Sequence, residues 1–193
     1  MPGPKWYIFN GNLNEQKDLE EYEMILSKII LNANKFIFVV GGELCSRVWN
    51  QPGIIEALGK SKAQQINFIC GPMFDIKNVN LLKMAKDKKI NLWLSKERQK
   101  EHYRVTDNGI FIEEDHMSFK PERNAKYCEN SHIISAAYLE RINNLQLNGF
   151  IEKIEIKDIL SKFDIQVYDE LEKENYRSPS QEEIKVVSDI LME

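Results

Sequence analysis

The chain alternates between segments with helical spacing and short continuous apolar runs. From residue 18 to about residue 32, apolar side chains recur every three or four positions, which predicts an amphipathic helix. Two shorter helical patterns follow at 54–58 and 78–86. Three runs rich in β-branched and aromatic residues have the length of buried strands, and they cover 35–40, 65–70 and 89–94. Strands and helices that alternate with short connections predict a parallel sheet with right-handed crossovers.

The pattern changes after residue 100. Segments 102–106 and 110–113 both have the composition of strands, and Asp107-Asn108-Gly109 separates them. Asn-Gly between two strands is a strong hairpin signal, because both residues accept the positive φ of a type I′ turn. The sheet is therefore predicted to gain antiparallel strands. The connection that follows contains one short strand near 125–128, and the spacing over 132–147 predicts another helix.

Together these elements predict an α/β fold, a mixed β-sheet flanked by helices, with a C-terminal helical extension. Residues 1–17 are polar and contain prolines, glycines and asparagines, which predicts an N-terminal arm in which Trp6–Phe9 could form a short strand. Residues 18–149 form the α/β domain. Residues 150–193 hold twelve acidic residues against six basic ones and are expected to form an acidic, mainly helical extension. Within it, Ser180 and Glu183 form a capping box that begins the last helix.

The composition is that of a globular domain and excludes several classes of protein. Of the 193 residues, 42% are apolar and 29% are charged. No apolar run approaches the ~20 residues of a membrane-spanning helix, and the first residues lack the apolar centre of a signal peptide, so we expect a cytoplasmic protein. The three cysteines form no CxxC pair, which argues against a disulfide framework and a zinc ribbon. We expect no metal and no other cofactor.

The charge distribution is uneven along the chain. The formal net charge of −4 argues against a protein that coats nucleic acid in bulk. Segment 83–104, however, holds eight basic residues against three acidic ones. A local positive edge of this kind can meet an anion, although such a run is most often a solvated helix face.

The candidate chemistry lies in the predicted hairpin. Residues two apart share a face of a strand, so His102 and Arg104 are expected to point the same way. A guanidinium binds phosphate oxygens in bidentate fashion, and an imidazole beside it can act as a nucleophile or as an acid and base near neutral pH. The returning strand brings Glu113, Glu114 and His116 back toward His102, where a carboxylate could orient the ring.

Two further features allow a functional and a structural interpretation. Gly41 and Gly42 follow the first buried strand, at the sheet edge where α/β proteins bind ligands, and could contact a phosphate. They form no known phosphate-binding loop, so a simple turn is the alternative. Cys128 and His132 lie one helical turn apart but would hold zinc only with another ligand. For His102 and Arg104 the corresponding alternative is an exposed strand pair bonded to Glu101 or Glu113.

The order of elements and the histidine that opens the hairpin make residues 18–147 resemble a single phospholipase D-like domain. The hallmark of that family is His-x-Lys followed by four residues and Asp, and then by Gly-Ser and Asn. In the family, the histidine attacks phosphorus and forms a phosphohistidine, and the lysine binds phosphate oxygens. A second copy of the motif, from another domain or from a dimer mate, supplies the acid for the leaving group.

The hallmark is only partly matched here. His102 corresponds to the family's histidine, and Arg104 stands in the place of the lysine. Asp107 follows the histidine by five residues instead of seven, and Glu113-Glu114-Asp115-His116 replaces Gly-Ser-x-x-Asn. The resemblance therefore implies a degenerate domain, and some branches of the superfamily are non-catalytic binding modules.

The departures from the hallmark favour a non-catalytic function. The domain would then bind a phosphate-bearing ligand through Arg104, Gly41 and Gly42, or a protein partner through residues 150–193. Nucleic acid is among the phosphate-bearing ligands that such a site could take.

The alternative is a metal-independent phosphodiesterase or nuclease. His102 would be the nucleophile, and His116 or the dimer mate's His102 would donate the proton to the leaving group. Asp107, Glu113 and Glu114 would support the site. With one motif per chain, this function requires a homodimer in which both histidines meet.

Overall fold

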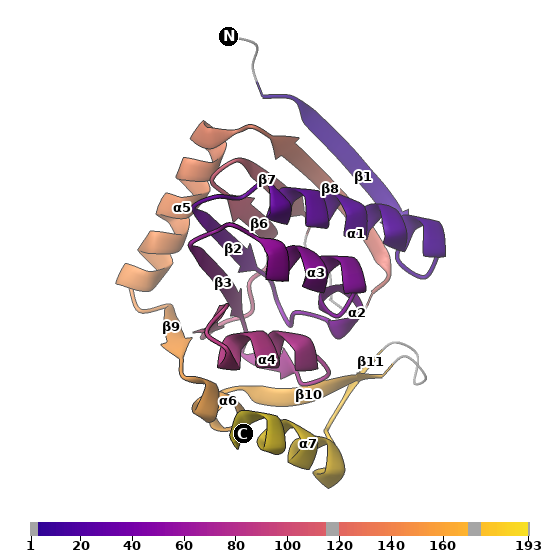
Figure 1. The fold of residues 1–193 in the computed structure, drawn as a ribbon, viewed down its shortest axis with the longest axis vertical. Coiled ribbons are helices and arrows are strands. Elements are labelled where there is room, and N and C mark those ends of the chain that lie inside the picture. The colour runs from indigo at the N-terminus through magenta and orange to yellow at the C-terminus, as the bar shows by residue number, and fades with distance from the viewer. Residues whose placement is uncertain (1–3, 115–119, 170–174, 193) are drawn as a thin grey trace.

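The computed structural model describes residues 4–114, 120–169 and 175–192, and it has the predicted α/β architecture (Figure 1). Eight strands form one mixed sheet, in the order β1 (Trp6–Asn12), β8 (Glu122–Glu129), β7 (Gly109–Glu113), β6 (His102–Thr106), β2 (Phe36–Val40), β3 (Gln65–Cys70), β5 (Asn91–Ser95) and β9 (Ile151–Ile154). A second sheet has the order β11 (Asn175–Arg177), β10 (Asp164–Asp169) and β4 (Met73–Asp75).

The three apolar runs form the parallel centre of the large sheet. β2, β3 and β5 pair in parallel, as their continuous apolar sequences predict. β6 then pairs antiparallel with β2, and β9 pairs antiparallel with β5. The prediction of a mixed sheet flanked by helices is confirmed.

Helices cover both faces of this sheet (Figure 1). On one face lie α1 (Gln16–Leu31), α2 (Ser46–Trp49), α3 (Pro52–Lys60) and α4 (Val79–Lys86), whose apolar sides join the larger of two core clusters. On the other face lies α5 (His132–Leu147), which packs Ile142 against Tyr103 and Val105 of β6. No helix among the described residues is long and apolar enough to span a membrane.

The β6–β7 hairpin exists, but the reason given for it from the sequence is wrong. Among the described residues with a positive φ, neither Asn108 nor Gly109 appears, so the turn is not of type I′. The hydroxyl of Thr106 instead accepts the backbone N–H groups of Asn108 (3.2 Å) and Gly109 (3.0 Å). A Cβ on Gly109 would lie 3.0 Å from the carbonyl oxygen of Cys128 on β8. Glycine is needed there because β8 approaches closely.

The N-terminal residues form a longer strand than the short one considered at Trp6–Phe9. Residues 6–12 form β1, which pairs with β8 along its whole length. Two aromatic side chains on the same face of β1 pack against the rest of the protein. Tyr7 stacks on Tyr127, and Phe9 packs edge-on against Tyr22 of α1. Residues 1–17, as far as the structure describes them, are therefore an edge strand and the beginning of α1.

Residues 150–193 contain the expected helices, and they contain strands as well. After β9 come η1 (Ile156–Asp158), α6 (Ile159–Lys162), β10, β11 and α7 (Gln181–Met192). Ile159, Phe163 and Val167 are buried in the same core cluster as α1 and β2. The composition changes near residue 150, but the sheet and the core continue across that point, because apolar burial does not follow the change in charge.

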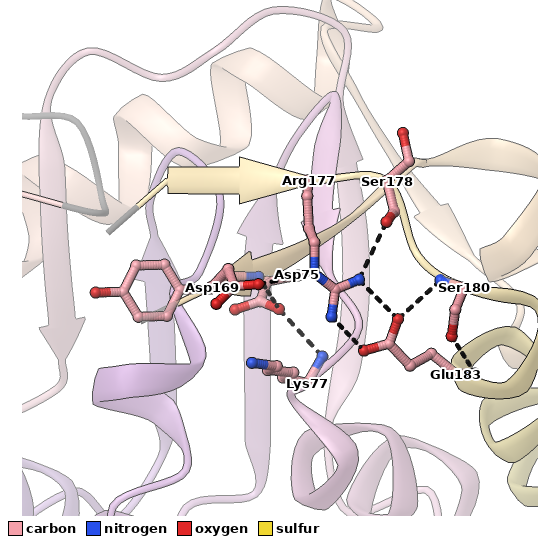
Figure 2. A network of polar contacts seen from close by, with 8 residues as sticks. Asp75, Lys77, Asp169, Arg177, Ser178, Ser180 and Glu183 are labelled. Atoms are coloured by element: carbon pink, nitrogen blue, oxygen red, sulfur yellow. Dashed lines mark hydrogen bonds and ion pairs between the residues drawn. The ribbon is translucent and has the colours of Figure 1, made fainter. Parts of the chain in front are cut away.

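One polar network fastens β10, β11 and α7 together (Figure 2). Arg177 donates hydrogen bonds to Asp169 (2.9 Å) and to both carboxylate oxygens of Glu183 (2.9 and 2.7 Å). The backbone N–H of Glu183 donates to the Ser180 hydroxyl (3.2 Å), and the backbone N–H of Ser180 donates to Glu183 (2.8 Å). The predicted capping box at the start of the last helix is thus confirmed.

Candidate functional site

Four polar side chains gather on the sheet face that lies beneath α1 and α2. His102 and Arg104 share this face because they are two residues apart on β6. In the register of the hairpin, His102 lies opposite Glu113, which brings Glu113 to the same face. Ala125 on β8 lies opposite Glu113, so Arg123, two residues earlier, faces the same way.

Glu113 is the centre of this group. Its side chain is buried, and one carboxylate oxygen accepts a hydrogen bond from Nη1 of Arg104. The other oxygen accepts a hydrogen bond from the Tyr22 hydroxyl (2.7 Å) and lies 3.6 Å from Nε of Arg123. A buried carboxylate needs such partners, because an unpaired charge away from water is strongly unfavourable.

The titration behaviour of the neighbours agrees with this pairing. Burial is the largest single effect and lowers the pKa of Arg104, but the charge of Glu113, the Tyr22 hydroxyl and the hydrogen bond to Glu113 together outweigh it, so the pKa is raised overall and Arg104 stays a cation. Burial raises the pKa of the Tyr22 hydroxyl, which therefore remains a neutral donor to Glu113.

Aromatic rings hold the Arg104 guanidinium from two sides. Its central carbon lies 5.5 Å from the ring centroid of Trp49 and 5.5 Å from that of Phe111. Both distances are within the range of cation–π attraction. The guanidinium is thus fixed between two rings and one carboxylate.

His102 is also buried, with 2% of its surface exposed. Its Nε2 atom lies 3.1 Å from the backbone carbonyl oxygen of Gln99. A carbonyl oxygen can only accept, so this hydrogen bond assigns the proton to Nε2. A protonated ring nitrogen has no lone pair with which to attack phosphorus.

The cavity at these residues is small. It measures about 20 Å³ and is lined on the polar side by His102, Arg104 and Arg123. Gly41 and Gly42 close it from the loop after β2, and a Cβ on Gly42 would lie 3.4 Å from both His102 Nε2 and Arg98 Nε. A volume of this order holds about one water molecule, and a phosphate group does not fit.

The remaining residues singled out in the sequence lie elsewhere or outside the described residues. Asp107 is at the other end of β6, where its carboxylate accepts the backbone N–H groups of Asn34 and Lys35, both at 3.0 Å. Burial raises the pKa of Asp107, but these hydrogen bonds outweigh burial and lower it overall. Glu114 is exposed and accepts a hydrogen bond from Asn124 (3.2 Å). His116 lies outside the described residues.

Cys128 and His132 each have other surroundings. Cys128 is buried in the apolar cluster beneath α5, and Nδ1 of His132 lies 2.7 Å from the carbonyl oxygen of Asp107. Among the described residues, no group of three His, Cys, Asp or Glu side chains could hold a metal ion.

Two residues of this cluster, Tyr22 and Arg123, were not expected from the sequence. Tyr22 appeared only as an apolar position of a helix, and Arg123 lay in a segment expected to be mostly loop. Arg123 is buried and its neighbours Glu122 and Asn124 are exposed, but all three are polar, so the sequence carries no alternation that could have extended the strand to Arg123.

Several solved structures share this fold. The phospholipase D family member Nuc from Salmonella typhimurium matches 79% of this chain over 99% of its own, with a TM-score of 0.55 and 10% identity. TrmBL2, described as an archaeal chromatin protein with a novel mode of DNA binding, has a TM-score of 0.53 and 12% identity over 77% of this chain. The phosphatidylserine synthase of Haemophilus influenzae Rd KW20 has a TM-score of 0.51 and 12% identity over 77% of this chain.

These similarities show the fold and no more. This chain spans 53% of the length of the chromatin protein and 39% of the synthase. No protein-family model and no curated protein matches the sequence. At 10% to 12% identity, the fold is phospholipase D-like, as the order of elements led us to expect.

Proposed function

We propose that this phospholipase D-like domain is a non-catalytic binding module. One observation carries the proposal: a buried glutamate, Glu113, takes up the guanidinium of Arg104 at the place where a phosphate would have to bind. The sequence position that the family uses for a phosphate-binding lysine is therefore occupied by an internal ion pair.

The register of the hairpin places the Glu113 carboxylate beside the Arg104 guanidinium in the native fold. Glu113 lies opposite His102 on the adjacent strand, and its carboxylate is held by Tyr22 and Arg123 as well as by Arg104. A phosphate that entered would have to displace an anion with three partners and would meet that anion's negative charge at close range.

The state of His102 supports the same conclusion. Its Nε2 atom faces a carbonyl oxygen, and the cavity beside it measures about 20 Å³. A nucleophile must reach the phosphorus atom with a lone pair, at a contact distance of roughly 3 Å. Nε2, which faces the carbonyl oxygen, does not offer that lone pair, and the cavity leaves no room for a phosphate group.

Between the two ligand classes expected from the sequence, the geometry favours a protein partner. The pocket is filled by the protein's own side chains, which disfavours a phosphate-bearing ligand. Within residues 150–193, α7 exposes Val186 together with Glu182 and Asp189, which helical spacing places on one side, while Ile184 is exposed on the opposite side. An apolar side chain with an acidic margin fits a partner that presents apolar and basic residues.

The test of the non-catalytic proposal is a hydrolysis assay. Wild type and His102→Ala are compared on bis-p-nitrophenyl phosphate and on single- and double-stranded DNA, without metal and with EDTA. We expect both proteins to give the background rate, because His102 does not present a nucleophile. An active phospholipase D-type enzyme assayed in parallel is the control. Metal-independent hydrolysis by the wild type that is lost in His102→Ala would overturn the proposal.

A second experiment separates the two ligand classes. Inorganic phosphate and pyrophosphate are titrated into the wild type and into Arg104→Ala by calorimetry. We expect no saturable binding to the wild type, because Glu113 holds the guanidinium. Saturable binding by the wild type that Arg104→Ala abolishes would restore the phosphate-bearing ligand and contradict a protein partner as the main function of this domain.

A further inference from the structure

The outer edge of β1 is an open strand edge. β1 lies at one end of the large sheet, and β8 is its only strand neighbour among the described residues (Figure 1). Seven residues pair with seven on β8 without a bulge. The strand is therefore long and regular, with one side available for further pairing.

The backbone groups that point outward can be identified. The N–H of Leu13 donates to the carbonyl of Pro121, its counterpart on the β8 side, at 2.9 Å. In an antiparallel ladder, bonded and non-bonded pairs alternate, so Gly11, Phe9 and Tyr7 also face β8. The N–H and C=O groups of Ile8 and Asn10 then point away from β8.

Hydrogen bonding at the end of the strand agrees with this assignment. The N–H of Asn12, which falls in the outward set, donates to the side chain of Asp18 (2.8 Å). The structure thus gives a partner to the last outward amide, while none of the described residues bonds the outward amides of Ile8 and Asn10.

The other strand edges of this protein carry features that hinder pairing with another chain. β9, at the opposite end of the sheet, has only four residues, and two of them are the charged Glu152 and Lys153. β11 has only three residues. Short length and charge are the usual means by which proteins protect a sheet edge. β1 has neither, and Trp6–Asn12 contains no proline.

We propose that β1 pairs antiparallel with β1 of a second copy of this chain, so that the two large sheets become one. A two-fold axis places a strand antiparallel to its own copy, and this is the commonest symmetry of protein dimers. The strand is uncharged, so the pairing brings no like charges opposite each other. The Ile8 side chain is 74% exposed and would contact exposed side chains of β1 in the second copy, across the axis.

This dimer differs from the catalytic homodimer that the family resemblance implied. β6 is separated from β1 by β7 and β8. Across the joined sheet, the two copies of β6 would be seven strand spacings apart, or about 34 Å at the usual spacing. The two His102 side chains would therefore not meet. The proposal does not depend on whether the domain is catalytic.

The test is the oligomeric state of the full chain and of three variants, measured by light scattering and sedimentation over a wide range of concentration. Ile8→Pro removes an outward N–H but keeps the ladder to β8 intact. Ile8→Glu places a carboxylate opposite Lys126 of the same chain, which keeps β1 in place, but brings two carboxylates together across the axis. Ile133→Glu is the matched control, because Ile133 on α5 is 87% exposed and lies on a different element.

We expect a dimer for the wild type and for Ile133→Glu, and a dissociation constant at least about tenfold higher for both Ile8 variants. Circular dichroism checks whether each Ile8 variant retains the fold. If Ile8→Pro does not, Ile8→Glu alone carries the test. A wild type that stays monomeric at every concentration would overturn the proposal. A dimer that Ile133→Glu dissociates and the Ile8 variants leave intact would overturn it as well. Neither result bears on the hydrolysis assay, so the two proposals can fail separately.

Discussion

At position 113, a glutamate lies where the register of β7 turns its carboxylate toward two arginines and a tyrosine. Its side chain is buried, and so are those of Arg104 and Arg123. Removal of one member of a buried ion pair costs far more than the pair contributes net, because the remaining charge is left without a partner in a medium of low polarity. The stability of this region therefore depends on the Glu113 carboxylate, which lies beside both guanidinium groups.

We expect Glu113→Gln to lower the free energy of unfolding by about 3–5 kcal/mol, because two buried guanidinium groups lose their counter-charge. Urea denaturation measures the change. Glu114→Gln is the matched control: its side chain is exposed, and the effect should stay within about 0.5 kcal/mol. Equal effects of the two substitutions would show that Glu113 does not compensate these charges.

At the scale of elements, a network of polar side chains joins β10, β11 and α7. Arg177 bridges Asp169 of β10 and Glu183 of α7, and Glu183 also closes the capping box with Ser180 (Figure 2). The hydrogen bond from Arg177, with that from the Ser180 backbone, lowers the pKa of Glu183 to about 2. The folded state thus favours the ionised carboxylate.

This shift predicts a loss of stability in acid. A carboxyl group whose pKa is lower in the folded state contributes stability that is complete above its unfolded pKa, about 4.5 here, and that disappears as the pH falls toward about 2. We therefore expect the wild type to be more stable than Glu183→Gln at neutral pH, with a difference that shrinks between about pH 5 and pH 2.

Urea denaturation of both proteins over this pH range measures the difference. Glu182→Gln, at the adjacent position, serves as the control. Because Glu183 is only partly buried, solvent screening keeps the effect modest. A difference between wild type and Glu183→Gln that is independent of pH would contradict the contribution of the ion pair.

At the scale of the whole molecule, one core extends from the N-terminal strand to the C-terminal helix. Phe9 of β1, Phe163 after α6 and Val187 of α7 belong to the same cluster of buried side chains. Phe163 also packs against Phe74 of β4, with ring centroids 5.4 Å apart. The acidic C-terminal segment is thus expected to unfold together with the large sheet.

We expect Phe163→Ala to destabilise the whole domain by about 3–5 kcal/mol. Tryptophan fluorescence reports on the large sheet and α2, because Trp6, Trp49 and Trp93 all lie there, and far-ultraviolet circular dichroism reports on every element. The two signals should change together in urea, for the variant as for the wild type.

Phe150→Ala is the control for this substitution, since Phe150 is 49% exposed and its loss should cost much less. If Phe163→Ala shifted only part of the circular dichroism signal and left the tryptophan transition unchanged, residues 150–193 would be a separate folding unit.

The sequence by itself determined the features that depend on neighbours along the chain. The buried strands, the helices between them, the shared face of His102 and Arg104 and the capping box at Ser180 all follow from local periodicity and hydrogen bonding. The order of these elements was enough to indicate the fold, because right-handed connections leave few ways to arrange them.

Only the tertiary structure decided what those elements do together. Tyr22 and Glu113 are 91 residues apart in the sequence, yet they share a hydrogen bond that closes the pocket at Arg104. Residues 6–12 form an edge strand because β8, more than 100 residues later in the sequence, provides their backbone hydrogen-bonding partners. Contacts of this kind arise when the sheet register and the packing of α1 bring distant segments together, and no local pattern encodes such a register.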